Sequence, residues 1–286
     1  MLYLKIWDVK YGNATYIKTP NGKNIVQDLG TGTLKTGSAT FSPLLFLKNS
    51  MKINRLDEVI LTHPHGDHLK DILNFDTFSP EILNRPKGLT RKEILAANRA
   101  EDRELVEKYI EISSKYNEDI SGKESPLHTN NNGGASIQVF QSAKRTNSNI
   151  NHDSILTVIS YATSKVVLPG DNDEESLKEL LEQNGFKETI RNTDIFVAPY
   201  HGLESGFCED LFEYFRPKLV IVSNGRFDDS GCLSQYSDIA SGWDVHTRTG
   251  GIVERKCLTT KRDGNIEIAM GWITEGRKSF LSAIID

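Results

Sequence analysis

Four side chains that could bind a metal ion stand within six residues of each other, in the stretch Thr62-His63-Pro64-His65-Gly66-Asp67-His68. Imidazole nitrogens and carboxylate oxygens at this density suit zinc or another first-row divalent ion. A single catalytic metal ion needs three protein ligands and keeps one position open. Four donors in one segment therefore favour two metal ions. The alternative interpretation is a polar turn whose histidines cap a helix.

The residues on either side of this stretch predict a strand followed by a helix. Leu56–Leu61 is a short apolar run suited to a buried strand, whereas Leu69, Ile72 and Leu73 have helical spacing. The donors thus lie where a strand end turns into a helix start.

In such a turn, different donors can reach two neighbouring positions. His63 and His65 can project to the same side, while Asp67 and His68 leave the helix start towards a second point a short distance away. This arrangement again favours two metal ions over one.

The stretch resembles the H-x-H-x-D-H motif of the metallo-β-lactamase superfamily, which matches at His63, His65, Asp67 and His68. The resemblance implies an α/β fold, a four-layer αββα sandwich with a dinuclear site at one edge. It also implies a cofactor of two divalent metal ions, Zn²⁺ or Mn²⁺.

Two other apolar segments, Lys165–Pro169 and Asp194–Ala198, are predicted strands that end close to further donors, Asp171 and His201. Residues at strand ends gather at the same sheet edge, so these donors should converge on the histidine turn. The resemblance implies that His63 and His65 bind one ion, that Asp67, His68 and His201 bind the other, and that Asp171 bridges them. It also gives Asp67 a catalytic role.

The opening of the chain resembles more narrowly the metallo-β-lactamase domain of ComEC-type DNA-uptake proteins. The likeness lies in Trp7–Ala14, Pro20–Gly22 and Asp28–Gly30. The D-V-G-Q-G-D stretch of that family is matched in part, because Lys10 and Tyr11 stand between the Asp-Val pair and the second glycine.

The resemblance implies that a histidine from a further loop completes the first metal site, and His152 is the best candidate because it lies 19 residues before Asp171. A substrate contact or a supporting contact to a ligand is the alternative role for it. The ComEC-type N-x-x-S pattern is matched around it by Asn151 and Ser154, which we assign to substrate binding.

The likeness continues at Pro199–Ser205, where Tyr200 replaces the first histidine of a P-H-H-G-S stretch and is assigned to the substrate edge. It extends to Val220–Gly225 and Val245–Ile252. Within the last stretch, His246 could protonate a leaving oxygen, although a histidine on a strand is more often simply hydrogen-bonded.

Asp28 follows a predicted strand and stands beside glycines. It could satisfy loop amides. We favour a supporting contact to the histidine turn.

The composition is that of a soluble globular protein with a sizeable core, at 37% hydrophobic and 26% charged residues. Nowhere do eighteen apolar residues run together, and three widely spaced cysteines suit a reducing compartment. We therefore expect a cytoplasmic protein that does not enter a membrane. The net charge of −5 does not decide the substrate, because two metal ions would add about +4 locally.

The chain is predicted to form a single domain over residues 1–286 with a helical insertion at about 76–135. Pro80 and Pro86 precede a long charged segment, Thr90–Asn117, which carries one apolar stripe at helical spacing. The stripe consists of Leu105, Val106, Tyr109, Ile110 and Ile112. This helix could be a solvated cover of the sandwich, a wall of the substrate cleft, or a contact to a protein partner.

The other predicted elements follow from apolar periodicity. Helices are expected at 40–52, 174–183 and 207–215. Strands are expected at 2–9, 14–19, 24–28, 136–141, 154–161, 218–223, and near 243–256 and 264–270.

These observations together predict a dinuclear metal-dependent hydrolase. A water bridged by two divalent ions is deprotonated near neutral pH and can attack phosphorus or a carbonyl. A bridging aspartate such as Asp171 is shared, by the resemblance, among phosphodiesterases, nucleases and thioesterases, whereas zinc β-lactamases use cysteine or histidine there. A phosphodiesterase or nuclease acting on nucleic acid or a nucleotide-like phosphodiester is favoured. The alternatives are a hydrolase of a small ester, lactone, thioester or cyclic nucleotide, and a metal-binding but catalytically silent interaction protein.

Overall fold

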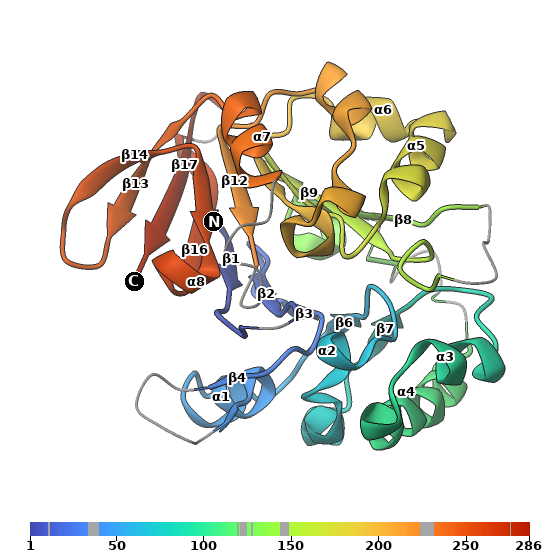
Figure 1. The fold of residues 1–286 in the computed structure, drawn as a ribbon. Helices are drawn as coiled ribbons and strands as arrows, with labels where there is room; N and C mark the ends of the chain where they lie inside the picture. Colours follow the sequence, from blue (N-terminus) through green and yellow to red (C-terminus); the bar gives the residue numbers. More distant parts are fainter. Residues whose placement is uncertain are drawn as a thin grey trace.

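Two β-sheets pack face to face, and helices cover the outer face of each sheet (Figure 1). The computed structural model describes residues 1–10, 12–33, 40–118, 120, 125–126, 128–143, 149–223, 232–274 and 276–286. The predicted αββα sandwich is confirmed.

Nine strands of the described part of the chain form the larger sheet, in the order β14-β13-β17-β16-β1-β2-β3-β6-β7. Neighbouring strands are antiparallel except for β13–β17, β3–β6 and β6–β7, which are parallel. The strands are β1 (Leu2–Ile6), β2 (Thr15–Lys18), β3 (Asn24–Gln27), β6 (Glu58–Ile60), β7 (Ile82–Asn84), β13 (Trp243–Thr247), β14 (Ile252–Arg255), β16 (Ile266–Thr274) and β17 (Lys278–Ile285).

The smaller sheet has the order β15-β12-β11-β10-β9-β8 among the described residues. The run from β10 to β15 is parallel, and β8–β9–β10 is antiparallel. The strands are β8 (Ser136–Phe140), β9 (Leu156–Tyr161), β10 (Ser164–Leu168), β11 (Ile195–Val197), β12 (Leu219–Val222) and β15 (Cys257–Thr259), and a separate short pair is formed by β4 (Gly32–Thr33) and β5 (Thr40–Phe41).

Two groups of helices, one on the outer face of each sheet, form the outer layers (Figure 1). None of the helices in the described part of the chain has the length and apolar character needed to span a bilayer. The α-helices are α1 (Pro43–Asn49), α2 (Gly66–Leu69), α3 (Arg91–Ala97), α4 (Arg103–Lys115), α5 (Glu174–Glu182), α6 (Phe186–Ile190), α7 (Cys232–Ile239) and α8 (Thr260–Asp263). The 3₁₀ helices are η1 (Ile72–Thr77), η2 (Ala100–Asp102), η3 (Thr129–Asn132), η4 (Pro199–Gly202), η5 (Glu204–Gly206) and η6 (Glu209–Glu213).

The core has three apolar layers, because side chains alternate between the two faces of each strand. The central layer lies between the sheets and includes Leu4 of β1 and Ile221 of β12. One outer layer packs α1, α2, η1, α3 and α4 on the larger sheet, and the other packs α5, α6, η6 and α7 on the smaller sheet. Fully burying one Leu or Ile side chain contributes about 1.5–3 kcal/mol.

The helix predicted at 40–52 is shorter than expected. Residues Thr40–Phe41 are a strand, and the helix starts only at Pro43, where the Ser42 side chain accepts a hydrogen bond from the Leu45 N–H. Proline is favoured at the first helical position because it lacks an N–H that would need a partner. The helix ends before Lys52, which has a left-handed φ of 57°.

The predicted insertion at about 76–135 takes part in the core. Strand β7 belongs to the larger sheet as its edge strand next to β6. The stripe of α4 buries Val106, Tyr109 and Ile112 in the same outer layer as Trp7 of the β1 end. Sheet pairing and burial therefore make part of this segment core structure and not an addition to a complete core.

Two further differences concern the C-terminal half. The helix predicted at 207–215 is the shorter 3₁₀ helix η6, whose N-cap residue Cys208 makes no side-chain cap hydrogen bond. Such short segments often take the tighter helix. Strand β17 was not predicted, although it pairs along β16. Tyr11, Asn224 and Gly225, named in the resemblance above, lie outside the described residues.

Candidate metal centre

The histidine turn connects the end of β6 to α2, at the edge where the two sheets meet. The Thr62 carbonyl accepts a hydrogen bond of 2.8 Å from the Ile155 N–H, which leads into β9 of the other sheet. His63 and His68 are buried, whereas His65 and Asp67 are partly exposed. The turn thus presents its donors at the bottom of an opening between the layers.

Asp171 enters this edge from the turn after β10. The preceding residue, Gly170, has a φ of +63°, and a Cβ atom built on it would lie 2.8 Å from Thr62 Cβ. A glycine is therefore needed for the backbone to approach the histidine turn so closely. This close approach brings the Asp171 carboxylate within reach of the histidines.

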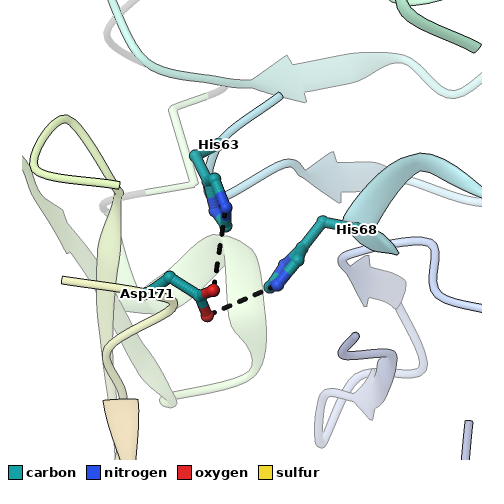
Figure 2. A group of neighbouring side chains, drawn as sticks. All are labelled: His63, His68 and Asp171. Atoms are coloured by element: carbon teal, nitrogen blue, oxygen red, sulfur yellow. Dashed lines mark ion pairs between the residues drawn. The ribbon is translucent and has the colours of Figure 1, made fainter. Parts of the chain in front are cut away.

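The Asp171 carboxylate lies close to three histidine rings. Its Oδ1 is 3.3 Å from His68 Nε2, and its Oδ2 is 3.8 Å from His63 Nε2, as Figure 2 shows. Its Oδ2 is also 3.3 Å from His201 Nε2. One carboxylate therefore faces donors of two neighbouring groups.

These donors form two groups, and within each group the ligand atoms all lie within 4.8 Å of one another. One group is His63, His68 and Asp171, and the other is Asp67, His68 and His201. His65 lies beside the first group, with its Nδ1 3.0 Å from His63 Nε2.

His201 comes from η4, directly after β11. Tyr200 and His201 have left-handed φ values of 53° and 55°, followed by Gly202 at 79°. Such values cost a non-glycine residue of order 1–3 kcal/mol and persist only where surrounding contacts enforce them. His201 Nδ1 donates to the Ser223 carbonyl at 3.1 Å, and Ser223 Oγ donates to the Gly12 carbonyl at 3.0 Å. These contacts leave His201 Nε2 directed at the carboxylates.

Burial lowers the pKa of His63 well below its ordinary value and also lowers the pKa of His65. Both rings are therefore neutral near pH 7. A neutral imidazole is the form that binds a metal ion.

The other charged groups of the centre stabilise one another. Burial alone would lower the pKa of His68 and His201, but Asp171, together with Asp28 at His68 and Asp67 at His201, outweighs burial, raising the His68 pKa well above its ordinary value and the His201 pKa to about 10. Burial alone would raise the pKa of Asp171 and Asp67, but the same histidines hold both well below the ordinary range. Both carboxylates are therefore ionised.

This donor set fits divalent metal ions. Ionised carboxylates are concentrated in a buried place, and imidazole nitrogens lie beside them at distances a bound ion could span. Nitrogen and oxygen donors of this kind suit zinc or manganese. His63, His65 and Asp171 could hold one ion, and Asp67, His68, His201 and Asp171 the other.

Asp28 lies behind His68, on the side away from the other donors. Its Oδ1 accepts from the Thr62 N–H at 2.8 Å, and its Oδ2 lies 3.0 Å from His68 Nδ1. Asp28 itself has a left-handed φ of 59°. A carboxylate on the second ring nitrogen holds a ligand histidine in orientation and makes it more basic.

The structure does not place His152 among the ligands. Its Nδ1 lies 3.1 Å from Asp173 Oδ1, and its Nε2 lies 3.2 Å from Glu179 Oε2. Both ring nitrogens are therefore occupied by carboxylates, which raise the His152 pKa although burial lowers it. The prediction that His152 completes the first site is corrected to a buried ion pair that joins the Asn151 loop to α5.

His246 lies far from the centre. It is exposed on β13, and five strands of the larger sheet separate β13 from β6. At about 4.8 Å between strands, that separation is roughly 25–30 Å along the sheet. The predicted role of His246 in protonating a leaving group is therefore wrong. The resemblance of Val245–Ile252 to the ComEC-type pattern did not indicate where this strand lies in the sheet.

Two of the three residues assigned to substrate binding line a cavity, and the third does not. Asn151 and Tyr200 line a cavity of about 390 Å³ at the metal centre, together with His65, Asp67, Asp171 and His201. Ser154 does not line it and is fully buried, and its hydroxyl has no hydrogen-bond partner among the described residues. The assignment of Ser154 to substrate binding is corrected to a buried position in the loop.

Several other lining residues were not predicted from the sequence. Lys10 and Lys70 lie on the rim, and Ala97, Asn98, Arg99, Glu101 and Asp102 form a wall from the α3–α4 segment. Neither their types nor their spacing carries a recognisable signal. Only the residues of the α3–α4 segment were covered by an expectation, namely that this segment could form a wall of the substrate cleft.

Comparison with protein families finds one match that covers most of the chain. The model of the metallo-beta-lactamase superfamily matches residues 7–220. No curated protein matches the chain.

Among solved structures, the chain is similar to a metal-dependent hydrolase of the beta-lactamase superfamily, with 14% identity and a TM-score of 0.45, covering 91% of this chain and 96% of that one. It is also similar to Zn²⁺-bound PqqB from Methylobacterium extorquens, with 10% identity and a TM-score of 0.40, covering 78% and 89%. A diphosphatase from the PhnP family has 10% identity and a TM-score of 0.40, covering 78% and 87%.

Proposed function

The chain belongs to the metallo-beta-lactamase superfamily, and on that premise we propose that it is a dinuclear metal-dependent hydrolase that cleaves phosphodiester bonds. The observation that carries this proposal is the Asp171 carboxylate, whose Oδ1 faces His68 and whose Oδ2 faces both His63 and His201. A bridging ligand for two ions requires that position.

Two divalent ions bound there would activate a water molecule for attack and neutralise charge at the reacting phosphorus. His63, His65 and Asp171 would hold one ion, and Asp67, His68, His201 and Asp171 the other. Asp67 also faces the cavity, and its carboxylate oxygen would accept the proton of the attacking water.

The charges on the cavity rim support an anionic substrate. Lys10, Lys70 and Arg99 line the cavity, accompanied by Glu101 and Asp102. With two divalent ions at its base, the cavity has a positive balance, which attracts a phosphodiester. Asn151 and Tyr200 line the cavity as well and would orient the group next to the phosphorus.

A second candidate is favoured by the size of the cavity. At about 390 Å³, it is at the lower end of ordinary small-molecule sites. A cyclic nucleotide or another small substrate, including an ester, lactone or thioester, would fit without the rest of a polymer. A nuclease would take only the end or one flipped nucleotide of a chain into it.

The ComEC-like branch and a cytoplasmic location are part of the same proposal. The first is supported by the partial match at Trp7–Ala14, and the second by the three widely spaced cysteines, an odd number that suits a reducing compartment. We also propose that the α3–α4 segment contacts a protein partner.

The test begins with elemental analysis of protein purified without chelator, which should show two transition-metal ions per chain. Zinc- or manganese-loaded protein should hydrolyse bis-nitrophenyl phosphate and be compared on single-stranded DNA, RNA, cyclic nucleotides and lactones. Asp67→Ala, Asp171→Ala and His201→Ala should each remove activity, whereas His246→Ala is the matched control and should keep it. The proposal fails if no metal is bound, or if Asp67→Ala cleaves the phosphodiester as fast as the wild-type protein.

A further inference from the structure

The side-chain amide of Asn98 contacts the histidine turn on both sides of His65. Its Oδ1 accepts from the Gly66 N–H at 2.9 Å, and its Nδ2 donates to the Pro64 carbonyl at 2.8 Å. Nδ2 also donates to the Ile94 carbonyl of its own helix, α3, at 2.9 Å. One side chain from the α3–α4 segment thus engages the peptide groups directly before and after a metal-binding residue.

We propose that Asn98 is a positioning residue that holds His65 in place for the first metal ion, an inference that rests on the proposed dinuclear site. The physical reason is a conflict at the start of α2. His65 occupies the N-cap position but makes no side-chain cap hydrogen bond. N-cap side chains ordinarily satisfy the free N–H groups at a helix start. Because the His65 ring is turned to the metal centre, Asn98 supplies an acceptor in its place.

The neighbouring Asp102 adds a steric contact at the same point. A Cβ atom built on Gly66 would lie 2.3 Å from Asp102 Cγ and 2.5 Å from its Oδ2. Gly66 therefore leaves room for the η2 end of the α3–α4 segment to rest directly on the turn.

The α3–α4 segment is itself firmly anchored. Ile94 precedes Asn98 and is buried, and Val106, Tyr109 and Ile112 of α4 are buried in the same apolar layer. The Asn98 amide makes three hydrogen bonds, to α3 and to the turn, which restrict its rotamers and let it define the position of the turn. The segment that forms the cavity wall thereby also controls the metal centre.

The decisive experiment measures zinc affinity in a double-mutant cycle. Zinc is titrated against a chromophoric chelator for the wild-type protein, Asn98→Ala, His65→Ala and the double variant. His65→Ala identifies which binding step belongs to the first ion. Asn98→Ala should weaken that step by about 10–100-fold, the range seen when a residue that orients a ligand is lost, and should change the other step by less than about threefold.

In the His65→Ala background, Asn98→Ala should cause little further loss, because residues that act as a unit are not additive. Hydrogen exchange at the Gly66 amide, followed without metal, should be faster in Asn98→Ala. Lys92→Ala, exposed on the same helix, is the control and should change neither quantity. Asn98→Asp provides a second variant of equal volume if Asn98→Ala does not fold, and its carboxylate, which repels the Pro64 carbonyl, should also weaken the first step.

The outcomes separate the two proposals. Wild-type protein that binds neither zinc nor manganese would overturn the proposed function and this inference with it. If the wild-type protein binds two ions, two results would overturn the positioning role alone. One is that Asn98→Ala changes the zinc affinity of neither step. The other is that Asn98→Ala lowers zinc affinity as much in the His65→Ala background as in the wild-type protein.

Discussion

His68 Nδ1 lies 3.0 Å from Asp28 Oδ2, and both side chains are completely shielded from solvent. The same carboxylate accepts from the Thr62 backbone and hydroxyl. Asp28 therefore holds both the backbone of the turn and the ring of a candidate ligand.

Asp28→Asn should lower zinc affinity by about 10–100-fold, because the amide replaces the carboxylate partner of His68 without removing its bulk. The measurement is the same chelator competition. Asp244→Asn, exposed on β13, should leave the affinity unchanged. Equal affinity in Asp28→Asn and the wild-type protein would contradict a supporting role for Asp28.

His152→Gln should leave two metal ions bound but destabilise the fold. The substitution removes the positive partner of Asp173 and Glu179. Leaving partly buried carboxylates without this partner costs about 1–3 kcal/mol in the free energy of unfolding. Urea unfolding and elemental analysis test this, with the exposed His128→Gln as control. Loss of one ion per chain, with stability retained, would restore His152 as a ligand.

Gly12→Ala should displace the metal-binding turn, whereas Gly22→Ala should not. Both glycines have positive φ, at +98° and +89°, so each alanine costs about 1 kcal/mol in backbone strain. Only at Gly12 would the new Cβ meet the Asp67 carbonyl, at 2.0 Å, while no atom of the described residues lies within 4 Å at Gly22. Metal content should therefore fall in Gly12→Ala alone. Two ions retained by both variants would show that the contact is not needed.

Glu58→Gln should stabilise the protein at alkaline pH. Burial raises the pKa of Glu58 from 4.5 to about 7, against the smaller opposing effect of its hydrogen bond from Asn84. Between these values the folded protein keeps a proton that the unfolded chain releases, so the stability associated with this group is lost as the pH rises from about 4.5 to 7.

The difference in unfolding free energy between Glu58→Gln and the wild-type protein should therefore increase by about 3 kcal/mol from pH 4.5 to pH 8. Urea unfolding at the two pH values measures it. Glu254→Gln, exposed on β14, should show no such change. A difference independent of pH would mean that Glu58 ionises normally in the folded protein.

The sequence by itself determined the local part of this protein. Residues 56–69 predicted a strand, a turn with four donors and a helix start, and the superfamily inferred from that turn is confirmed by the match over residues 7–220. Neighbouring residues in a turn have few backbone conformations, so spacing carries much of their geometry. The strands that end near Asp171 and His201 were also predictable, because each is a short apolar run.

Only the tertiary structure decided which distant side chains meet. His152 and His246 have suitable chemistry, but one ring lies between two carboxylates and the other is exposed across the sheet. Asn98 has no chemical signature, and its role arises because α3 packs against the turn, more than thirty residues away along the chain. Contacts at such separations depend on how the layers pack and which rotamers that packing allows, and neither is encoded in the spacing of residues along the sequence.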